Sequence, residues 1–340
     1  MRTRYLRKHL TACLLAVCLA SFLLLLFLPE NQPFIVIDMP LVDPDPVYQF
    51  DWSPDGNKFV CSTEGGIFVM NADGSNITEI LLNYSTWLTR PRFSPDGKRI
   101  LLQGVLDGGY ISDSNIYVVN LDGTGLRQLT SVNGSRDPDW SPDGGRIVFA
   151  RHGTRHGAAE IDEGLGGIWV MDADGSNQRR LTEIGFQPAW SPDGKSIAYA
   201  IQDVNASLSG ILSIHILNLD DGRERQLPWT TELPGGVTGI DWTPDGRWLI
   251  AGINEHIYII NVDRGYSQWI IPSLLGRYNM YPRLSPDGTT LAYTQLVTIS
   301  HYTATLKIHL ARLAIIPQFK FIVAAFPILA LLILRRKHRI

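Results

Sequence analysis

The segment from residue 151 to residue 157 carries the side chains best suited to chemistry in this chain. It reads Arg-His-Gly-Thr-Arg-His-Gly and includes His152 and His156. An imidazole between two guanidinium groups could accept a phosphoryl group while the arginines hold the phosphate oxygens. The same stretch, together with Glu160, Asp162 and Glu163, offers nitrogen and oxygen ligands for a divalent ion. The segment therefore raises two hypotheses, phosphoryl transfer and metal binding.

The surroundings of this segment weigh against both hypotheses. Its arginine–histidine order resembles the motif of the histidine phosphatases, which belongs to an α/β fold and needs a distant second histidine and an acid. Here the motif opens a long connection between two apolar strand patterns, Ile147–Ala150 and Ile168–Asp172. The connection is rich in glycine and lacks the spacing that would place ligands on one helix face. We interpret it as a polar loop and expect neither a metal nor a cofactor.

A repeated turn motif organises most of the chain. The sequence Ser-Pro-Asp-Gly, or Thr-Pro-Asp-Gly in one copy, begins at Ser53, Ser94, Ser141, Ser191, Thr243 and Ser285. In such a turn proline presets φ, the Ser and Asp side chains bond nearby amides, and glycine accepts a positive φ. Copies recur every 41 to 52 residues, which is the period of a four-stranded propeller blade. Six copies predict six blades.

The same series of strand patterns surrounds each copy. An apolar run such as Ile197–Ala200 follows the turn, and a second run such as Ile116–Asn120 ends in an Asp-Gly hairpin before a more polar strand. The residue just before each turn is large and apolar: Trp52, Phe93, Trp140, Trp190, Trp242 and Leu284. We therefore expect an all-β fold, a six-bladed β-propeller of four-stranded antiparallel blades.

These patterns resemble the TolB-like propeller repeat, whose signature is Trp-Ser-Pro-Asp-Gly followed later by Ile-Tyr-Val-Met-Asn-x-Asp-Gly. The resemblance runs from about Val47 to Arg312. It implies the propeller fold, which hosts binding modules, scaffolds and accessory domains of enzymes alike. The resemblance identifies the fold and leaves several functions open.

The sixth repeat lacks a fourth strand of its own. After Leu291–Thr294 and Leu306–Leu313 the sequence has neither an Asp-Gly hairpin nor a polar strand. The apolar run 34–39 precedes the first repeat and has no partner nearby. Because an unpaired sheet edge and an orphan strand are both costly, we expect 34–39 to close the sixth blade. The alternative is that 34–39 is only a linker.

Both ends of the chain carry membrane signals. An uncharged apolar run at 10–28 follows a basic segment at 1–9, and it is long enough to span a bilayer as an uncleaved helix. A second apolar segment at 314–334 precedes a basic tail at 335–340. The positive-inside rule places both basic ends in the cytoplasm and the propeller, 29–313, on the extracytoplasmic side. The alternative for the second segment is a processed sorting signal rather than a transmembrane helix.

The charge of the propeller excludes one class of partner. All 33 acidic residues lie within 29–313, together with 21 of the 30 basic residues, so this region carries 12 more negative than positive charges. Phosphate recognition needs a basic face, and nucleic acid is therefore not an expected partner. Only Cys61 of the three cysteines lies in this region, so no disulfide can form within it.

The lengths of the connections indicate where binding should occur. The short Pro-Asp-Gly and Asp-Gly turns share one end of each blade, which leaves the long connections at the other end. Long loops on a rigid scaffold are the usual place for binding. The candidate residues on this face are Trp87, Asp107, Tyr110, His152, His156, Trp229, Glu232, Tyr278 and Tyr281. Such aromatic and acidic side chains could bind a glycan or a protein.

A second candidate site lies one residue before each large apolar residue. The residues at this position are Asp51, Arg92, Asp139, Ala189, Asp241 and Arg283. If they face the central channel, their charges nearly alternate around it. The compensated charge favours a structural ring of ion pairs, and a ligand site in the channel is the alternative.

Together these observations predict a membrane-tethered, extracytoplasmic propeller that binds a protein or cell-envelope partner without catalysis. The alternatives are a glycan-binding or lyase-type propeller, or an accessory propeller related to the prolyl-oligopeptidase-type enzymes. The last class would need a Gly-x-Ser-x-Gly elbow and a hydrolase domain, which this sequence does not contain. Charged, ordered side chains converging in the channel would favour the glycan or lyase alternative, whereas a plugged channel would argue against it. The sequence does not indicate an oligomeric state.

Overall fold

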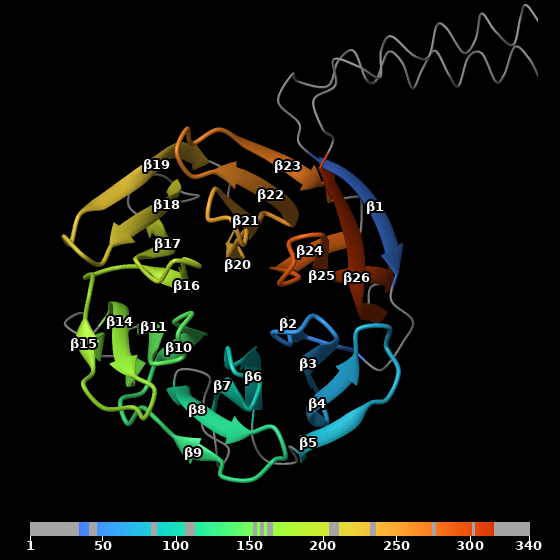
Figure 1. Cartoon of the computed structure of the whole chain (residues 1–340), viewed down its shortest axis with the longest axis horizontal. Coiled ribbons are helices and arrows are strands. Elements are labelled where there is room, and N and C mark those ends of the chain that lie inside the picture. The colour runs from blue at the N-terminus through green and yellow to red at the C-terminus, as the bar shows by residue number, and fades with distance from the viewer. Residues whose placement is uncertain are drawn as a thin grey trace, which may run out of the picture. The chain divides into compact units, whose positions relative to one another are not determined.

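A computed structural model describes residues 34–315, apart from 41–45, 83–86, 106–112, 152–154, 157–159, 162–165, 204–210, 232–235, 274–276 and 301–302. The chain divides into two compact units, Val36–Leu313, and Met1–Ile35 with Ala314–Ile340. The first unit contains six four-stranded sheets arranged as the blades of a ring (Figure 1). The predicted all-β six-bladed propeller is confirmed.

Blades 1 to 5 are antiparallel meanders whose first strand is innermost in the ring, and blade 6 takes its outer strand from the start of the structure. Blade 1 contains β2 (Gln49–Trp52), β3 (Lys58–Thr63), β4 (Gly66–Asn71) and β5 (Thr78–Leu82). Blade 2 contains β6 (Trp87–Phe93), β7 (Arg99–Val105), β8 (Asn115–Asn120) and β9 (Arg127–Gln128). Blade 3 contains β10 (Ser135–Trp140), β11 (Arg146–Arg151), β14 (Gly167–Asp172) and β15 (Arg179–Arg180).

The remaining blades follow the same plan. Blade 4 contains β16 (Phe186–Trp190), β17 (Ser196–Asp203), β18 (Ile211–Asn218) and β19 (Glu224–Thr231). Blade 5 contains β20 (Val237–Trp242), β21 (Trp248–Ile253), β22 (His256–Asn261) and β23 (Ser267–Ile271). Blade 6 contains β24 (Arg277–Leu284), β25 (Thr290–Ser300), β26 (Thr303–Ile315) and, as its outer strand, β1 (Phe34–Pro40). The hairpin of β12 (Arg155–His156) and β13 (Glu160–Ile161) leaves blade 3 between β11 and β14.

The order of the sixth sheet, β1-β26-β25-β24, brings the first strand of the structure beside the last. This is the place that the sequence assigns to 34–39. Packing joins blade 6 to blade 1. Val47, Phe50 and Phe59 of blade 1 share a buried cluster with Ala292 and Ile308 of blade 6. The ring is therefore continuous through a hydrophobic core as well as through strand pairing.

The Ser-Pro-Asp-Gly motif forms the turn between the first two strands of every blade. In blade 1 the Ser53 hydroxyl donates to Asp55 Oδ1 at 2.5 Å and accepts a hydrogen bond from the amide of Lys58 at 2.9 Å, while Gly56 has a φ of 71°. Hydrogen bonding to Ser53 lowers the pKa of Asp55, so the carboxylate stays charged. These turns and the Asp-Gly hairpins lie at one end of the blades, which we call the turn face. We call the opposite end the loop face.

The predicted transmembrane segments at 10–28 and 314–334 lie outside the described residues, except that Ala314 and Ile315 belong to β26. Within the described ranges, every element is a strand, and no helix is long and apolar enough to cross a membrane.

Candidate functional site

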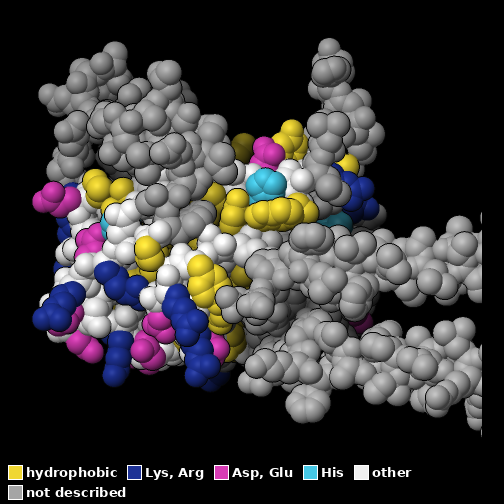
Figure 2. All heavy atoms as spheres, turned by 90° about the horizontal axis from the view of Figure 1, so that it is seen from above, with side chains coloured by type: hydrophobic (Ala, Val, Ile, Leu, Met, Phe, Trp, Pro, Cys, Tyr) yellow, Lys and Arg dark blue, Asp and Glu magenta, His cyan; other side chains and the backbone are white. Residues whose placement is uncertain are grey.

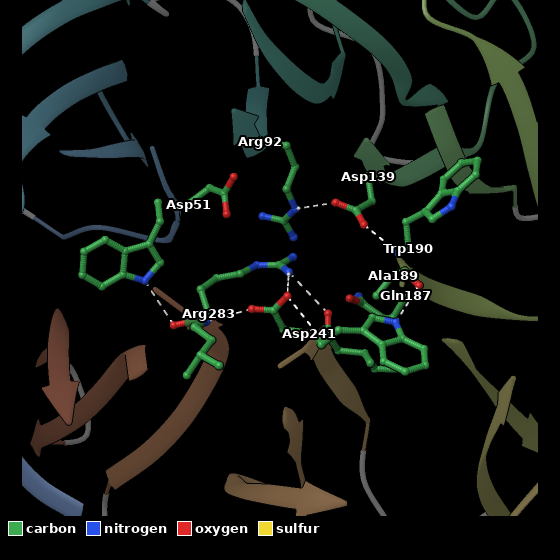
Figure 3. Close-up of polar contacts among 12 residues, drawn as sticks. Asp51, Arg92, Asp139, Gln187, Ala189, Trp190, Asp241 and Arg283 are labelled. Atoms are coloured by element: carbon green, nitrogen blue, oxygen red, sulfur yellow. Dashed lines mark hydrogen bonds and ion pairs between the residues drawn. The ribbon is translucent and has the colours of Figure 1, made fainter. Parts of the chain in front are cut away.

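The central channel brings together the five charged residues that stand just before the large apolar residue of a repeat. Asp51, Arg92, Asp139, Asp241 and Arg283 come from the innermost strands of five blades and point toward the axis (Figure 3). Ala189 holds the same position in blade 4, so one place around the axis carries no charge. We call these six residues the axial ring. It contains three carboxyl groups and two guanidinium groups.

The three carboxyl groups of the axial ring join blades in pairs. Asp51 accepts a hydrogen bond from the amide of Phe93 at 2.9 Å. In the same way Asp139 accepts from Trp190 at 2.8 Å, and Asp241 accepts from Leu284 at 2.8 Å. Each bond runs from an odd-numbered blade to the next blade along the chain. These side chains therefore have a direct structural task, the fixing of one inner strand against its neighbour.

The two arginines of the axial ring partly balance these carboxyl groups. Arg92 Nε lies 3.9 Å from Asp139 Oδ1, and Arg283 Nη1 lies 3.5 Å from Asp241 Oδ1. Burial raises the pKa of Asp51 and of Asp139 to about 6, against the lowering effect of Arg92. Burial, reinforced by the other two carboxyl groups, raises the pKa of Asp241 to about 8. Of the three carboxyl groups, Asp241 therefore has the most strongly raised pKa.

A second layer of side chains lies two residues earlier in the inner strands, toward the loop face. The backbone of Arg90, Asp137, Gln187 and Tyr281 has a positive φ of 51° to 54°, and in each case the next residue is proline. The pairing register shifts at these points, as expected for a β-bulge, where an unpaired residue accommodates a proline that cannot donate a hydrogen bond. We call these four residues the plug.

Arg90 joins the members of the plug to one another. Its Nε lies 2.7 Å from Asp137 Oδ1, its Nη1 donates to Gln187 Oε1 at 3.0 Å, and its guanidinium lies 5.5 Å from the ring centre of Tyr281. The cavity beside Arg90 and Tyr281 has a volume of about 10 Å³, which is room for about one water molecule. Little space is therefore left between Arg90 and Tyr281 on this side of the channel.

Sequence reasoning found the axial ring but missed the plug. A usable signal existed, because four blades share an X-Pro step just before the ring position, at Pro91, Pro138, Pro188 and Pro282. A proline inside an apparent inner strand indicates a bulge, and a bulge turns an extra side chain toward the channel.

The structure describes only part of the predicted binding face. Trp87 is 68% exposed where it begins β6, and Tyr278 and Tyr281 are partly buried in β24. His156 and Trp229 lie in the strands β12 and β19. Asp107, Tyr110, His152 and Glu232 lie outside the described residues. Of the aromatic candidates with described side chains, Tyr281 belongs to the plug and Trp87 faces solvent.

Exposed apolar side chains mark three consecutive links between blades on the loop face. Trp87 lies at the link into blade 2, Val132 (39% exposed) at the link into blade 3, and Ile184 (59% exposed) at the link into blade 4. The sequence analysis included only Trp87. Charged side chains of both signs, in contrast, gather along the lower edge of the ring in Figure 2. Each of these links thus presents an apolar side chain that another protein could cover.

The segment considered for phosphoryl transfer does not present its first arginine to a ligand. Arg151 is 3% exposed, donates to Gln178 Oε1 at 3.1 Å, and stacks 4.2 Å from the ring centre of Trp169. Burial lowers its pKa. Arg151 thus packs within its own blade, and the described ranges contain no group of three His, Cys, Asp or Glu side chains placed to hold a metal ion.

Comparison with known proteins supports the fold from sequence and from structure. Residues 229–261 match the family model of the WD domain, G-beta repeat. The Tol-Pal system protein TolB of Francisella tularensis subsp. mediasiatica is 28% identical over 258 residues, covering 73% of this chain and 53% of that protein. The chain therefore spans about half the length of the curated relatives that it matches.

Solved structures share the fold at lower identity. TolB from Acinetobacter baumannii is 17% identical with a TM-score of 0.54, covering 78% of this chain and 62% of that chain. A gluconolactonase from Xanthomonas campestris is 15% identical with a TM-score of 0.59, covering 82% and 89%. An oligogalacturonate lyase from Vibrio parahaemolyticus is 13% identical with a TM-score of 0.54, covering 80% and 79%. The repeat sequence, the six-bladed fold and these relatives together support a TolB-like β-propeller family for this chain.

Proposed function

We propose that this protein is a membrane-tethered, extracytoplasmic propeller that binds a protein or cell-envelope partner through its loop face and catalyses no reaction. The observation that carries the proposal is the set of exposed apolar side chains at Trp87, Val132 and Ile184. Burying these side chains against a partner would remove apolar surface from water and so contribute favourable free energy to binding. The relatives named Tol-Pal system proteins agree with an assembly role.

The channel has one feature on each side of the choice between binding and a lyase-type or lactonase-type reaction. The charged side chains of the axial ring converge in it, which favours a reaction or a glycan ligand, whereas the contacts of the plug argue against one. A catalytic channel needs side chains that are free to contact a substrate, whereas the guanidinium of Arg90 already bonds to Asp137 and Gln187. The acidic groups of the axial ring are likewise bonded to backbone amides. A reaction in the channel, as the enzymes of similar fold suggest, remains the alternative function. It would require the contacts of Arg90 with Asp137 and Gln187 to break so that a substrate could enter.

Site-specific photocrosslinking in cells tests the partner face. A photoreactive amino acid placed at Ile184 should give a crosslinked product of defined mass, and the product should weaken when Trp87→Ser is added. Leu126, 40% exposed on the turn face, provides a matched control position. The same product from Leu126 and Ile184, or a product indifferent to Trp87→Ser, would contradict the proposal.

The location of the propeller needs a separate test, because the tether lies outside the described residues. Cys61 is buried and will not report on access in the folded protein, so an introduced thiol is required. Glu79→Cys places one on the exposed outer strand β5. We expect a membrane-impermeant maleimide to label this variant in intact cells, and labelling only after lysis would reject the extracytoplasmic location.

A further inference from the structure

Four of the six junctions between blades carry a tryptophan on the turn face, and these four are of two kinds. In the first kind, an arginine five residues after the motif serine reaches across to the tryptophan of the next blade. Arg99 lies 4.9 Å from the ring centre of Trp140, and Arg146 lies 4.9 Å from the ring centre of Trp190. These are cation–π contacts from blade 2 to blade 3 and from blade 3 to blade 4.

In the second kind of junction the arginine is replaced by a short side chain while the tryptophan is kept. Ser196 of blade 4 precedes Trp242 of blade 5, and Thr290 of blade 6 precedes Trp52 of blade 1. A cleft of about 700 Å³ is lined by Ser196 and Trp242, and one of about 630 Å³ by Thr290 and Trp52. A cleft accompanies each of these two short side chains, and the tryptophans beside the clefts, Trp242 (8% exposed) and Trp52 (7%), are only slightly more exposed than Trp140 and Trp190 (5% each).

The tryptophans also differ in their hydrogen bonds between the two kinds of junction. Trp242 Nε1 donates to the carbonyl of Ala189 at 3.1 Å, and Trp52 Nε1 donates to the carbonyl of Arg283 at 3.2 Å. The Nε1 atoms of Trp140 and Trp190 are buried without a hydrogen-bond partner. The indoles beside the clefts are thus anchored from the inner side, which fixes their position without help from an arginine.

Acidic side chains outnumber basic ones in the lining of the cleft between blades 4 and 5, although Glu224 already lies 2.6 Å from His215 Nδ1 and Asp193 and Asp245 accept hydrogen bonds within their own turns. Four acidic residues line it, namely Asp193, Asp221, Glu224 and Asp245. Of its two arginines, Arg223 pairs with Asp221 at 3.4 Å and Arg225 donates to the carbonyl of Val262 at 2.8 Å. The apolar side chains of Ile216 and Val262 line the same cleft and could pack against the methylene groups of a long cationic side chain.

We propose that the cleft between blades 4 and 5 binds an arginine side chain of a partner polypeptide, with its guanidinium over Trp242 as Arg99 lies over Trp140. The chain itself shows which group suits this place, since two equivalent junctions are filled by arginine. The cleft lies on the turn face, so it is distinct from the loop-face surface and does not depend on it. The acidic lining selects a cation, and the indole favours a planar one.

Fluorine NMR of the full-length protein labelled with 5-fluorotryptophan tests this proposal. The probe is the blocked tripeptide Gly-Arg-Gly, and its matched control replaces arginine with neutral citrulline. The Trp242 resonance, assigned with Trp242→Phe, should shift saturably as the arginine peptide is added. The dissociation constant of the citrulline peptide, measured in the same way, should be about tenfold higher. No shift up to about 50 mM, or equal shifts with both peptides, would overturn the proposal.

Two variants locate the response in the cleft. Ser196→Arg supplies the guanidinium from the chain itself and should abolish the shift, whereas Thr290→Arg, in the other cleft, should leave it intact. In case Ser196→Arg folds poorly, Asp245→Asn keeps a side-chain oxygen for its turn and should weaken the arginine peptide about threefold, with no effect on citrulline. Unchanged binding of the arginine peptide by a folded Ser196→Arg or Asp245→Asn variant would refute the site.

Discussion

Arg90 in blade 2 and Gln187 in blade 4 are joined by a hydrogen bond of 3.0 Å that reaches past the intervening blade. Nε of the same guanidinium lies 2.7 Å from Asp137 Oδ1 in blade 3, and the backbone N–H of Gln187 donates to Asp137 Oδ2 at 3.3 Å. Three consecutive blades are thus connected by side chains at the centre of the ring. The connection depends on bulges that turn these side chains inward.

Loss of Arg90 should destabilise the ring strongly. Arg90→Leu would remove the guanidinium that lies 2.7 Å from the carboxyl of Asp137, whose side chain is 8% exposed. We expect the free energy of unfolding to fall by about 3 kcal/mol, measured by urea denaturation. Adding Asp137→Asn should recover part of the loss. A loss no greater than that from Arg247→Ala, on the exposed turn face, would contradict the role of the plug.

The axial ring predicts an unusual dependence of stability on pH. The folded protein keeps Asp51 and Asp139 protonated up to about pH 6 and Asp241 up to about pH 8, whereas their ordinary pKa is 3.8. Unfolding therefore releases protons in this window, and the free energy of unfolding should fall as the pH rises from about 4 to about 8.

Asp241→Asn should remove much of this dependence. Asparagine can still accept the amide hydrogen bond of Leu284, and the variant leaves two carboxyl groups opposite two guanidinium groups. Because 23% of the Asp241 side chain is exposed, solvent screens part of the effect. We expect the variant to be about 1–3 kcal/mol more stable than the natural protein at pH 8.5, with no such advantage at pH 4.5. Parallel pH profiles in urea denaturation would show that Asp241 is ionised at low pH in the folded state.

Exchange of one side chain should convert one kind of blade junction into the other. Arg146→Ser removes the guanidinium above Trp190 and should lower the free energy of unfolding by about 1 kcal/mol. It should also make Trp190 more accessible to acrylamide in fluorescence quenching. The reciprocal change, Ser196→Arg, should protect Trp242. Equal quenching in all three proteins would mean that the arginine does not decide whether the junction is open.

The outer strand of blade 6 should matter for the whole ring. Replacement of Phe34–Pro40 by a Gly-Ser sequence of equal length removes the apolar strand beside β26 while keeping the chain length. We expect the melting temperature to drop by about 5 °C or more. The same replacement at residues 29–33 serves as the control. Equal melting of the natural protein and the strand variant would favour the linker interpretation of 34–39.

The sequence predicted the regular parts of this molecule because each depends on local chemistry. Ser53 and its five counterparts specify a turn through side-chain bonds within a few residues, and their period specifies the number of blades. Asp51 and the other ring residues could be placed because they hold a fixed position in each repeat. Even their inner orientation follows from the alternation along a strand.

The plug and the clefts were not predicted because they depend on pairs of residues from different repeats. Arg90 meets Gln187 only after three blades have assembled. The cleft beside Trp242 depends on Ser196, an ordinary polar residue at a strand start, which gains significance only beside a tryptophan 46 positions later. Variation between repeats thus carries information that the shared motif conceals.

The order of strands in blade 6 has a consequence for how the protein is made. Blades 1 to 5 each draw their strands from one continuous stretch, so each can form as soon as that stretch is available. Blade 6 combines the earliest strand with the latest ones, and such a distant pairing is slow to form. A partly synthesised chain would hold an open arc in which β1 lacks its partner β26 and the apolar face of blade 1 lacks its neighbour. Completion of the last hairpin is then the event that turns an aggregation-prone intermediate into a closed ring.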